Sequence, residues 1–158
     1  SNYVDNDYYR HKKNTEDFIK DNVSNYLIIR LPQVISNTGN QNNLVNFFIN
    51  SIKQHKKVKI QKHTKRALVD VEDVKILTCE LIKNHNKKTF NFSSVEQIGV
   101  YEIYKIICDI LLIKPNFEFV LPTFTTPLIE NDLEINKIIS ENIDKENYTY
   151  KILQKYIK

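Results

Sequence analysis

Residues Asp5–Lys20, with the sequence DNDYYRHKKNTEDFIK, decide how the rest of this chain is interpreted. Asp5 belongs to a residue type that caps helix N-termini, and no Pro or Gly interrupts the segment, so we predict a helix that begins near Asp5. Within it Tyr8, Lys12 and Glu16 recur at every fourth position. Because helical residues four apart lie on the same face, these three side chains should line one side of the helix.

An ammonium group one helical turn from a phenol can prepare that phenol for proton transfer. An unperturbed tyrosine titrates at about 10, and a nearby cation favours its phenolate form. Tyr8 and Lys12 are therefore a candidate acid–base pair; taken alone, the spacing is more often that of surface residues on an amphipathic helix. Tyr9 and Lys13 have the same spacing. We favour Tyr8 and Lys12 because only this register places an acid, Glu16, four residues further on.

Two later segments carry patterns of their own. Tyr26–Leu31 (YLIIRL) is an apolar run of strand length that leads into PQVIS. Its continuous apolar character is typical of a central parallel strand that is buried on both faces. Pro32 should end or bulge this strand, because proline has no N–H to donate. Arg66–Val74 (RALVDVEDV) indicates a short strand that runs into an acidic helix start, where Asp70 and Asp73 would have turn and cap roles.

The helix and these two segments together resemble the extended short-chain dehydrogenase/reductase family, the NAD-dependent epimerases and dehydratases of nucleotide sugars. Members carry a YxxxK helix with an acid one turn beyond the lysine, then a strand of the type hhhRxxNhhG, and later an R-x-h-h-x-V-x-D-h segment, where h is apolar. All three occur here in that order, over roughly Tyr8 to Phe119. Gln33 stands where the family usually has Asn, and Ser36 where it usually has Gly.

The resemblance implies a role for each matched residue. Tyr8 would exchange a proton with a sugar hydroxyl as hydride moves to or from the nicotinamide, and Lys12 would hold the nicotinamide ribose. Tyr8, Lys12 and Pro32 would thus contact the cofactor, which is NAD or NADP in the complete enzyme. Gln33 would touch the substrate. Arg66 would bind the substrate diphosphate, since a guanidinium can bind phosphate oxygens bidentately; the alternative is an exposed charge at a strand end.

The glycine-rich dinucleotide fingerprint of that family is missing. The chain has two glycines, Gly39 and Gly99, and neither lies in a strand–GxxGxxG–helix context. We therefore expect an α/β fold, the C-terminal part of a Rossmann-type parallel sheet plus a small substrate-binding α/β subdomain. Residues 1–35 would belong to the dinucleotide-binding domain, and residues 36–158 mainly to the substrate-binding part, with returning strands. Such a piece alone should not turn over substrate, because positioning the nicotinamide supplies much of the catalysis.

The rest of the chain alternates short apolar strands with amphipathic helices. We expect helices at 5–21, 43–55, 73–83, 100–112, 133–139 and 148–157, and strands at 26–31, 58–60, 67–71, 88–92 and 116–121. The strand 58–60 should be exposed, and the helix 43–55 should place Phe47 and Phe48 on a shared apolar face. Cys79 and Cys108 fall within apolar helical patterns, so they should be buried, reduced thiols of a cytoplasmic protein.

Composition sets limits on the class of protein. A chain of 158 residues with 41% hydrophobic and 27% charged residues has the size of one domain and can bury a core, unlike a disordered chain. No apolar run approaches the roughly 18 residues of a membrane span, and nothing resembles a signal peptide.

The net charge of +4 is unevenly spread. Lys53–Arg66 holds seven Lys or Arg in fourteen residues, together with His55 and His63. This run could be a solvated turn, a site for a substrate diphosphate, or a nucleic-acid surface, and the last is least favoured because no nucleic-acid module accompanies it. The two histidines have no Cys or carboxylate at metal-ligand spacing, so no metal site is predicted.

The leading hypothesis is an NAD(P)-dependent nucleotide-sugar epimerase, dehydratase or reductase, represented by its C-terminal portion. One alternative is a non-catalytic α/β sugar-nucleotide-binding domain of the same descent, and another is a basic anion- or nucleic-acid-binding module. The expected partners are a nucleotide-sugar substrate and, as the family implies, a second copy of the chain that forms a homodimer through the helix of Tyr8 and Lys12.

Overall fold

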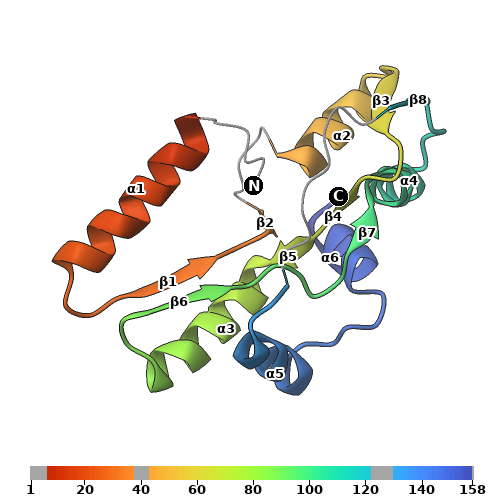
Figure 1. Cartoon of the computed structure of the whole chain (residues 1–158). Helices are drawn as coiled ribbons and strands as arrows, with labels where there is room; N and C mark the ends of the chain where they lie inside the picture. Colours follow the sequence, from red (N-terminus) through yellow and green to blue (C-terminus); the bar gives the residue numbers. More distant parts are fainter. Residues whose placement is uncertain (1–6, 38–42, 122–129, 158) are drawn as a thin grey trace.

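The computed structural model describes residues 7–37, 43–121 and 130–157. Figure 1 shows the order of its elements. They are α1 (Asp7–Asn22), β1 (Leu27–Arg30), β2 (Gln33–Ile35), α2 (Leu44–Lys53), β3 (Val58–Gln61), β4 (Lys65–Arg66), β5 (Leu68–Asp70), α3 (Val71–Asn84), β6 (Lys88–Asn91), β7 (Ile98–Gly99), α4 (Val100–Leu111), β8 (Phe117–Val120), α5 (Leu133–Asn142) and α6 (Tyr148–Tyr156). Every helix and strand expected from the sequence is present, and the short strands β2, β4 and β7 are additional.

Parallel strand pairs dominate the described part of the chain. β1 pairs with β6, β2 with β5 and β3 with β8, all in parallel, while β4 and β7 form an antiparallel pair. The two strands of each parallel pair are far apart in sequence and are separated by helices, as crossover connections require. This confirms the expected α/β class with parallel strands.

β1 has the expected parallel partner but lacks the expected burial on both faces. Leu27, Ile28 and Ile29 are half-buried, and Leu31, just beyond the strand, is 40% exposed. Within the described residues β1 is paired on one edge only, with β6. The described elements therefore cover the apolar side chains of β1 only in part.

The hydrophobic core lies among helices α2 to α6 and the strands that they enclose. Pairs of helices pack there, α2 against α4, α3 against α5, and α4 against α6. The largest fully buried side chains come from most of these elements and from the loop after β6: Tyr104, Phe48, Phe90, Phe92, Ile60, Leu68, Leu77, Leu81, Ile103, Ile107, Ile135 and Leu153.

Three expectations about burial are wrong. β3 is not exposed, because α4 packs against it and leaves Val58 and Ile60 only 2% and 1% exposed. Phe47 is 51% exposed, so it does not share the buried face of α2. Cys79 is exposed, since it lies on the outer side of α3, whereas Cys108 is buried as expected.

α1 is packed least of all the helices. None of its residues is buried, and Tyr8, Tyr9 and Phe18 are 61%, 55% and 65% exposed. In Figure 1 it lies beside β1, to one side of the other helices. Its expected start at Asp5 lies outside the described residues. Among the residues described, no helix combines the length and apolar character that crossing a membrane requires.

Candidate functional site

An ion pair fixes α1 against the strand that follows it. The Nε and Nη2 atoms of Arg30 donate to the two carboxylate oxygens of Glu16 at 2.9 and 2.7 Å, and Nη1 donates to the side chain of Asn91 at 3.2 Å. The hydrogen bond from Arg30 lowers the pKa of Glu16, against the effect of burial. Glu16 is the acid for which we favoured Tyr8 and Lys12 over Tyr9 and Lys13. It therefore has a structural role, because it orients the helix of Tyr8 and Lys12 on β1.

The structure brings Tyr8 and Lys12 together. The Nζ atom of Lys12 lies over the Tyr8 ring, 5.6 Å from its centroid, within the range of a cation–π contact. Lys12 forms no ion pair with a described carboxylate, so its charge is available to a ligand or to the phenol. Tyr8 also meets the ring of Tyr9 edge to face, with the centroids 5.7 Å apart. Both hydroxyl-bearing rings are on an open surface.

Gln33 carries a buried donor that the described protein does not satisfy. It is the first residue of β2 and directly follows Pro32, where the chain has left β1. Its Nε2 atom is buried and has no hydrogen-bond partner among the described residues. A buried amide without a partner is costly and rare, and it is one of the features by which a ligand site is recognised. The amide group of Gln33 is thus suited to an oxygen acceptor on a ligand.

Arg66 is connected to Gln33 through a strand pair. It ends β4 and pairs with Ile98 of β7. Leu68, two residues later, is the register partner of Gln33 across β2 and β5. Arg66 is half-buried, and its Nη1 atom donates to the carbonyl oxygen of Lys65 at 2.9 Å. No carboxylate in the described part of the chain pairs with Arg66, so no described side chain compensates its charge.

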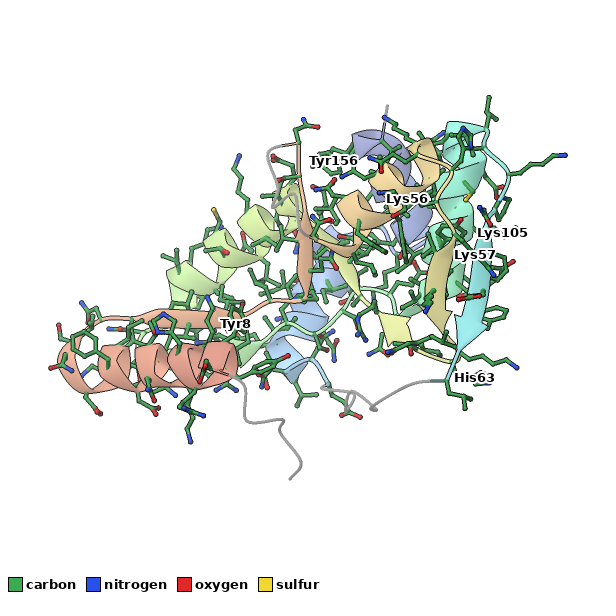
Figure 2. All side chains as sticks on the ribbon, turned by 90° about the horizontal axis from the view of Figure 1, so that it is seen from above. Tyr8, Lys56, Lys57, His63, Lys105 and Tyr156 are labelled. Carbon is green, nitrogen blue, oxygen red and sulfur yellow. The ribbon has the colours of Figure 1, made fainter. Side chains whose placement is uncertain are left out.

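The basic run Lys53–Arg66 extends over the end of α2, β3 and β4. Glu118 partly neutralises it, with one carboxylate oxygen 2.6 Å from the Nζ atom of Lys57 and the other 4.0 Å from that of Lys59. Figure 2 shows Tyr8 well separated from Lys56 and Lys57. Arg66, at the end of the run, lies two residues before Leu68, the register partner of Gln33.

Asp70 has the cap role expected of it. Its Oδ1 atom accepts from the backbone N–H of Glu72 at 2.9 Å, at the N-terminus of α3. The same carboxylate also binds the C-terminal helix, which the sequence does not reveal: the Nζ atom of Lys155 donates to Oδ2, and the hydroxyl of Tyr156 donates to Oδ1, each at 2.6 Å. The hydroxyl of Tyr148 accepts from the Asp70 N–H at 3.0 Å.

The pKa values of Asp70 and the nearby Asp73 are shifted in opposite directions. Burial alone would raise the pKa of Asp70, but the hydrogen bonds from Lys155 and Tyr156 outweigh it and hold that pKa below its ordinary value. Burial raises the pKa of Asp73, and the charge of Asp70 adds to this, although Asp73 accepts a hydrogen bond from Tyr148.

We expect acidification to remove part of the contribution that the Asp70 carboxylate makes to the free energy of unfolding. Because the pKa of Asp70 is depressed in the folded state, its contribution is complete above the unfolded pKa of about 4 and is lost as the pH falls through the folded value. Asp73 works against this, since its raised pKa favours protonation on folding. Urea unfolding between neutral and acidic pH should show a smaller loss for Asp70→Asn than for the wild type. Parallel profiles would contradict the prediction.

A hollow lies apart from these residues, between β6 and the start of α5. It has a volume of about 350 Å³ and is lined by Lys88, Thr89, Phe90, Asp132, Leu133 and Glu134. None of the site residues expected from the sequence lines it. Beside it, His85 and Lys88 both pair with Glu134. The described residues contain no group of three or more His, Cys, Asp or Glu side chains that could hold a metal ion.

No protein-family model and no curated protein matches the chain. Solved structures do match it. The Bordetella bronchiseptica enzyme WbmH in complex with NAD+ is 18% identical, and the match covers 98% of this chain and 54% of that one with a TM-score of 0.71. The dTDP-4-dehydrorhamnose reductase of Bacillus anthracis in complex with NADP is 19% identical, over 94% and 52% of the two chains, with a TM-score of 0.68.

The UDP-glucose 4-epimerase of Thermotoga maritima with UDP-glucose is 17% identical, over 94% of this chain and 50% of that one, with a TM-score of 0.62. The chain therefore spans about half the length of the solved structures that it matches. At these identities the likeness establishes the fold alone: the chain is folded like about half of each of these enzymes.

Proposed function

We propose that this chain supplies the acid–base pair and the substrate-binding part of an NAD(P)-dependent enzyme that acts on nucleotide sugars, as an epimerase, dehydratase or reductase. The observation that carries the proposal is the Glu16–Arg30 pair, which fixes the helix of Tyr8 and Lys12 on the strand that leads to Gln33. The fold supports it, because structures of the same fold hold NAD, NADP or UDP-glucose.

In this proposal Tyr8 moves the proton. As the phenolate, its exposed side chain takes a proton from a sugar hydroxyl and becomes the phenol; in the reverse direction the phenol returns the proton, and the ammonium group of Lys12 stabilises the phenolate that is left. Lys12 also donates to the ribose of the cofactor, and Tyr8 and Pro32 border the same site. The nicotinamide, when bound, supplies the hydride acceptor or donor. The residues present fit this group, because Lys12 has no described carboxylate that would compete for its charge.

Residues 36–158 mainly bind the substrate in this proposal, together with Gln33. The Gln33 amide donates to an oxygen of the sugar nucleotide, which satisfies the donor that has no partner among the described residues. The Arg66 guanidinium binds the diphosphate, where two parallel N–H···O bonds combine with opposite charge. Gln33, from β2, and Arg66, from β4, would thus contact the same ligand; Leu68, the register partner of Gln33, follows Arg66 by two residues.

The proposal is tested with the product of the native gene that contains this chain. The protein is incubated with NAD or NADP and a panel of UDP- and dTDP-sugars, while nicotinamide absorbance and product sugars are followed. We expect turnover of at least one sugar and binding of UDP that Arg66→Met weakens. Binding without turnover would favour a non-catalytic sugar-nucleotide-binding domain, and the absence of both would refute the proposal.

Replacing Gln33 by Leu should separate stability from binding. The substitution removes a buried donor that has no described partner, at similar side-chain volume, so the free energy of unfolding should stay unchanged or rise by up to about 2 kcal/mol. Affinity for the nucleotide sugar should fall, because the ligand oxygen loses its donor. Urea unfolding and calorimetric titration measure the two effects. Lower stability with unchanged affinity would show that the Gln33 amide serves the fold.

We also infer that α1 meets a second copy of the chain in a homodimer. Phe18 is 65% exposed on a helix without buried residues, which supports a protein partner on this helix. Light scattering at micromolar concentration should report a dimer, and Phe18→Asp should shift it toward monomer while Lys13→Asp, on the same helix, should not. A wild-type protein that is monomeric at micromolar concentration would contradict the inference.

A further inference from the structure

The C-terminal helix binds the end of a strand that belongs to the candidate site. α6 packs against β5, and Figure 1 shows the two elements side by side. Lys155 and Tyr156 each donate to the Asp70 carboxylate, one to each oxygen. From the first turn of α6, the Tyr148 hydroxyl accepts from the Asp70 N–H and donates to Asp73 at 2.6 Å.

These bonds satisfy a carboxylate that water hardly reaches. Asp70 is 5% exposed, and its backbone N–H bonds to Tyr148. Without the bonds from Lys155 and Tyr156, the N–H of Glu72 would be the only donor to this carboxylate among the described residues. A buried charge with so few donors is strongly unfavourable, so the turn between β5 and α3 would have to move toward solvent.

A movement of this turn would reach the residues that bind substrate in the proposed function. Asp70 is the register partner of Ile35, and Leu68 is that of Gln33, so β5 sets the place of β2. Arg66 precedes Leu68 by two residues, with one residue between β4 and β5. The position of both substrate-binding side chains therefore depends on where Asp70 is held.

We propose that Lys155, Tyr156 and Tyr148 are positioning residues: through Asp70 they hold β5, and so they set where Arg66 and Gln33 meet the nucleotide diphosphate of the substrate. That the ligand is a nucleotide diphosphate rests on the proposed function. That α6 holds β5 in place through Asp70 does not depend on it. The bonds to Lys155 and Tyr156 are charge-assisted and short, which is why two side chains near the chain end can fix a strand 85 residues earlier.

The test uses Tyr156→Phe and Lys155→Met in the full chain. Tyr150→Phe and Lys151→Met are the matched controls, because both lie on α6 and neither contacts Asp70 in the structure. Without ligand, amide hydrogen exchange of residues 65–70 should be several-fold faster in the two test variants than in the controls. Lys155→Arg, which keeps a charged donor, should restore slow exchange at least in part. Unchanged exchange would overturn the proposal.

A second readout separates positioning from general stability. UDP is titrated into each variant under conditions where circular dichroism shows the chain folded. We expect the dissociation constant to rise about three- to tenfold for Tyr156→Phe and Lys155→Met, and to stay unchanged for the controls. Faster exchange with unchanged UDP affinity would overturn the positioning role. A wild-type protein that does not bind UDP would count against the proposed function, and the exchange result would still decide whether α6 holds β5.

Discussion

Replacing Tyr8 by Phe is expected to lower the turnover of a nucleotide sugar by the native protein roughly 10²- to 10⁴-fold, the usual contribution of a positioned acid–base group. The phenyl ring keeps the contact with Lys12 and removes only the hydroxyl. Because the hydroxyl acts in the proton-transfer step, kcat should fall while KM changes little. Steady-state kinetics on the sugar with the highest turnover measures both constants.

Tyr9, from the alternative pair Tyr9 and Lys13, provides the matched control. Tyr9 is also on the exposed surface of α1, at 55% against 61% for Tyr8, and the two rings touch. Tyr9→Phe should leave kcat within a few-fold of the wild type. Lys12→Met should lower kcat and weaken cofactor binding together, because the ammonium group serves both in the proposed site. Loss of turnover on Tyr9→Phe, with Tyr8→Phe active, would assign the chemistry to Tyr9 and Lys13.

Truncating Leu153 to Ala is expected to cost about 2–5 kcal/mol of folding free energy, the range for large buried aliphatic side chains. Leu153 is completely buried in α6, which packs against α4 and β5. Total stabilities of domains are about 5–15 kcal/mol, so this one change should remove a large share. Urea unfolding followed by circular dichroism measures the change in the free energy of unfolding.

Leu133→Ala is the control for that truncation. Leu133 is 88% exposed at the start of α5, so the same chemical change should alter the free energy of unfolding by no more than about 0.5 kcal/mol. A small effect at Leu153 would mean that α6 contributes little to the core. In that case the hold of α6 on Asp70 would rest on its polar contacts alone.

The sequence determined the features that depend on neighbours along the chain. Helical periodicity located every helix to within a few residues, because side chains three and four apart must share a face. The same spacing placed Tyr8, Lys12 and Glu16 in line, and the contact of Lys12 with the Tyr8 ring follows from it. The α/β class also came from local signals, the alternation of short apolar strands with amphipathic helices.

Local signals failed where a distant element decides burial. Val58 and Ile60 alternate with polar residues like an exposed strand, and they are buried because α4 covers them. Phe47 and Cys79 belong to apolar helical patterns, but within the described part of the chain both are exposed. The strands β2, β4 and β7 have two or three residues each, which is too short for periodicity to show.

Only the tertiary structure showed what holds the candidate site together. Glu16 and Arg30 are 14 residues apart, and Asp70 and Tyr156 are 86 apart. Nothing in the types of these residues says that they will meet, since the hydrogen bonds form only after the chain has placed α1 beside β1 and α6 beside β5. The sequence by itself thus determined which chemical groups the site could contain. The packing of elements far apart in the chain decided which of those groups face each other, because burial and hydrogen-bond geometry depend on contacts in space.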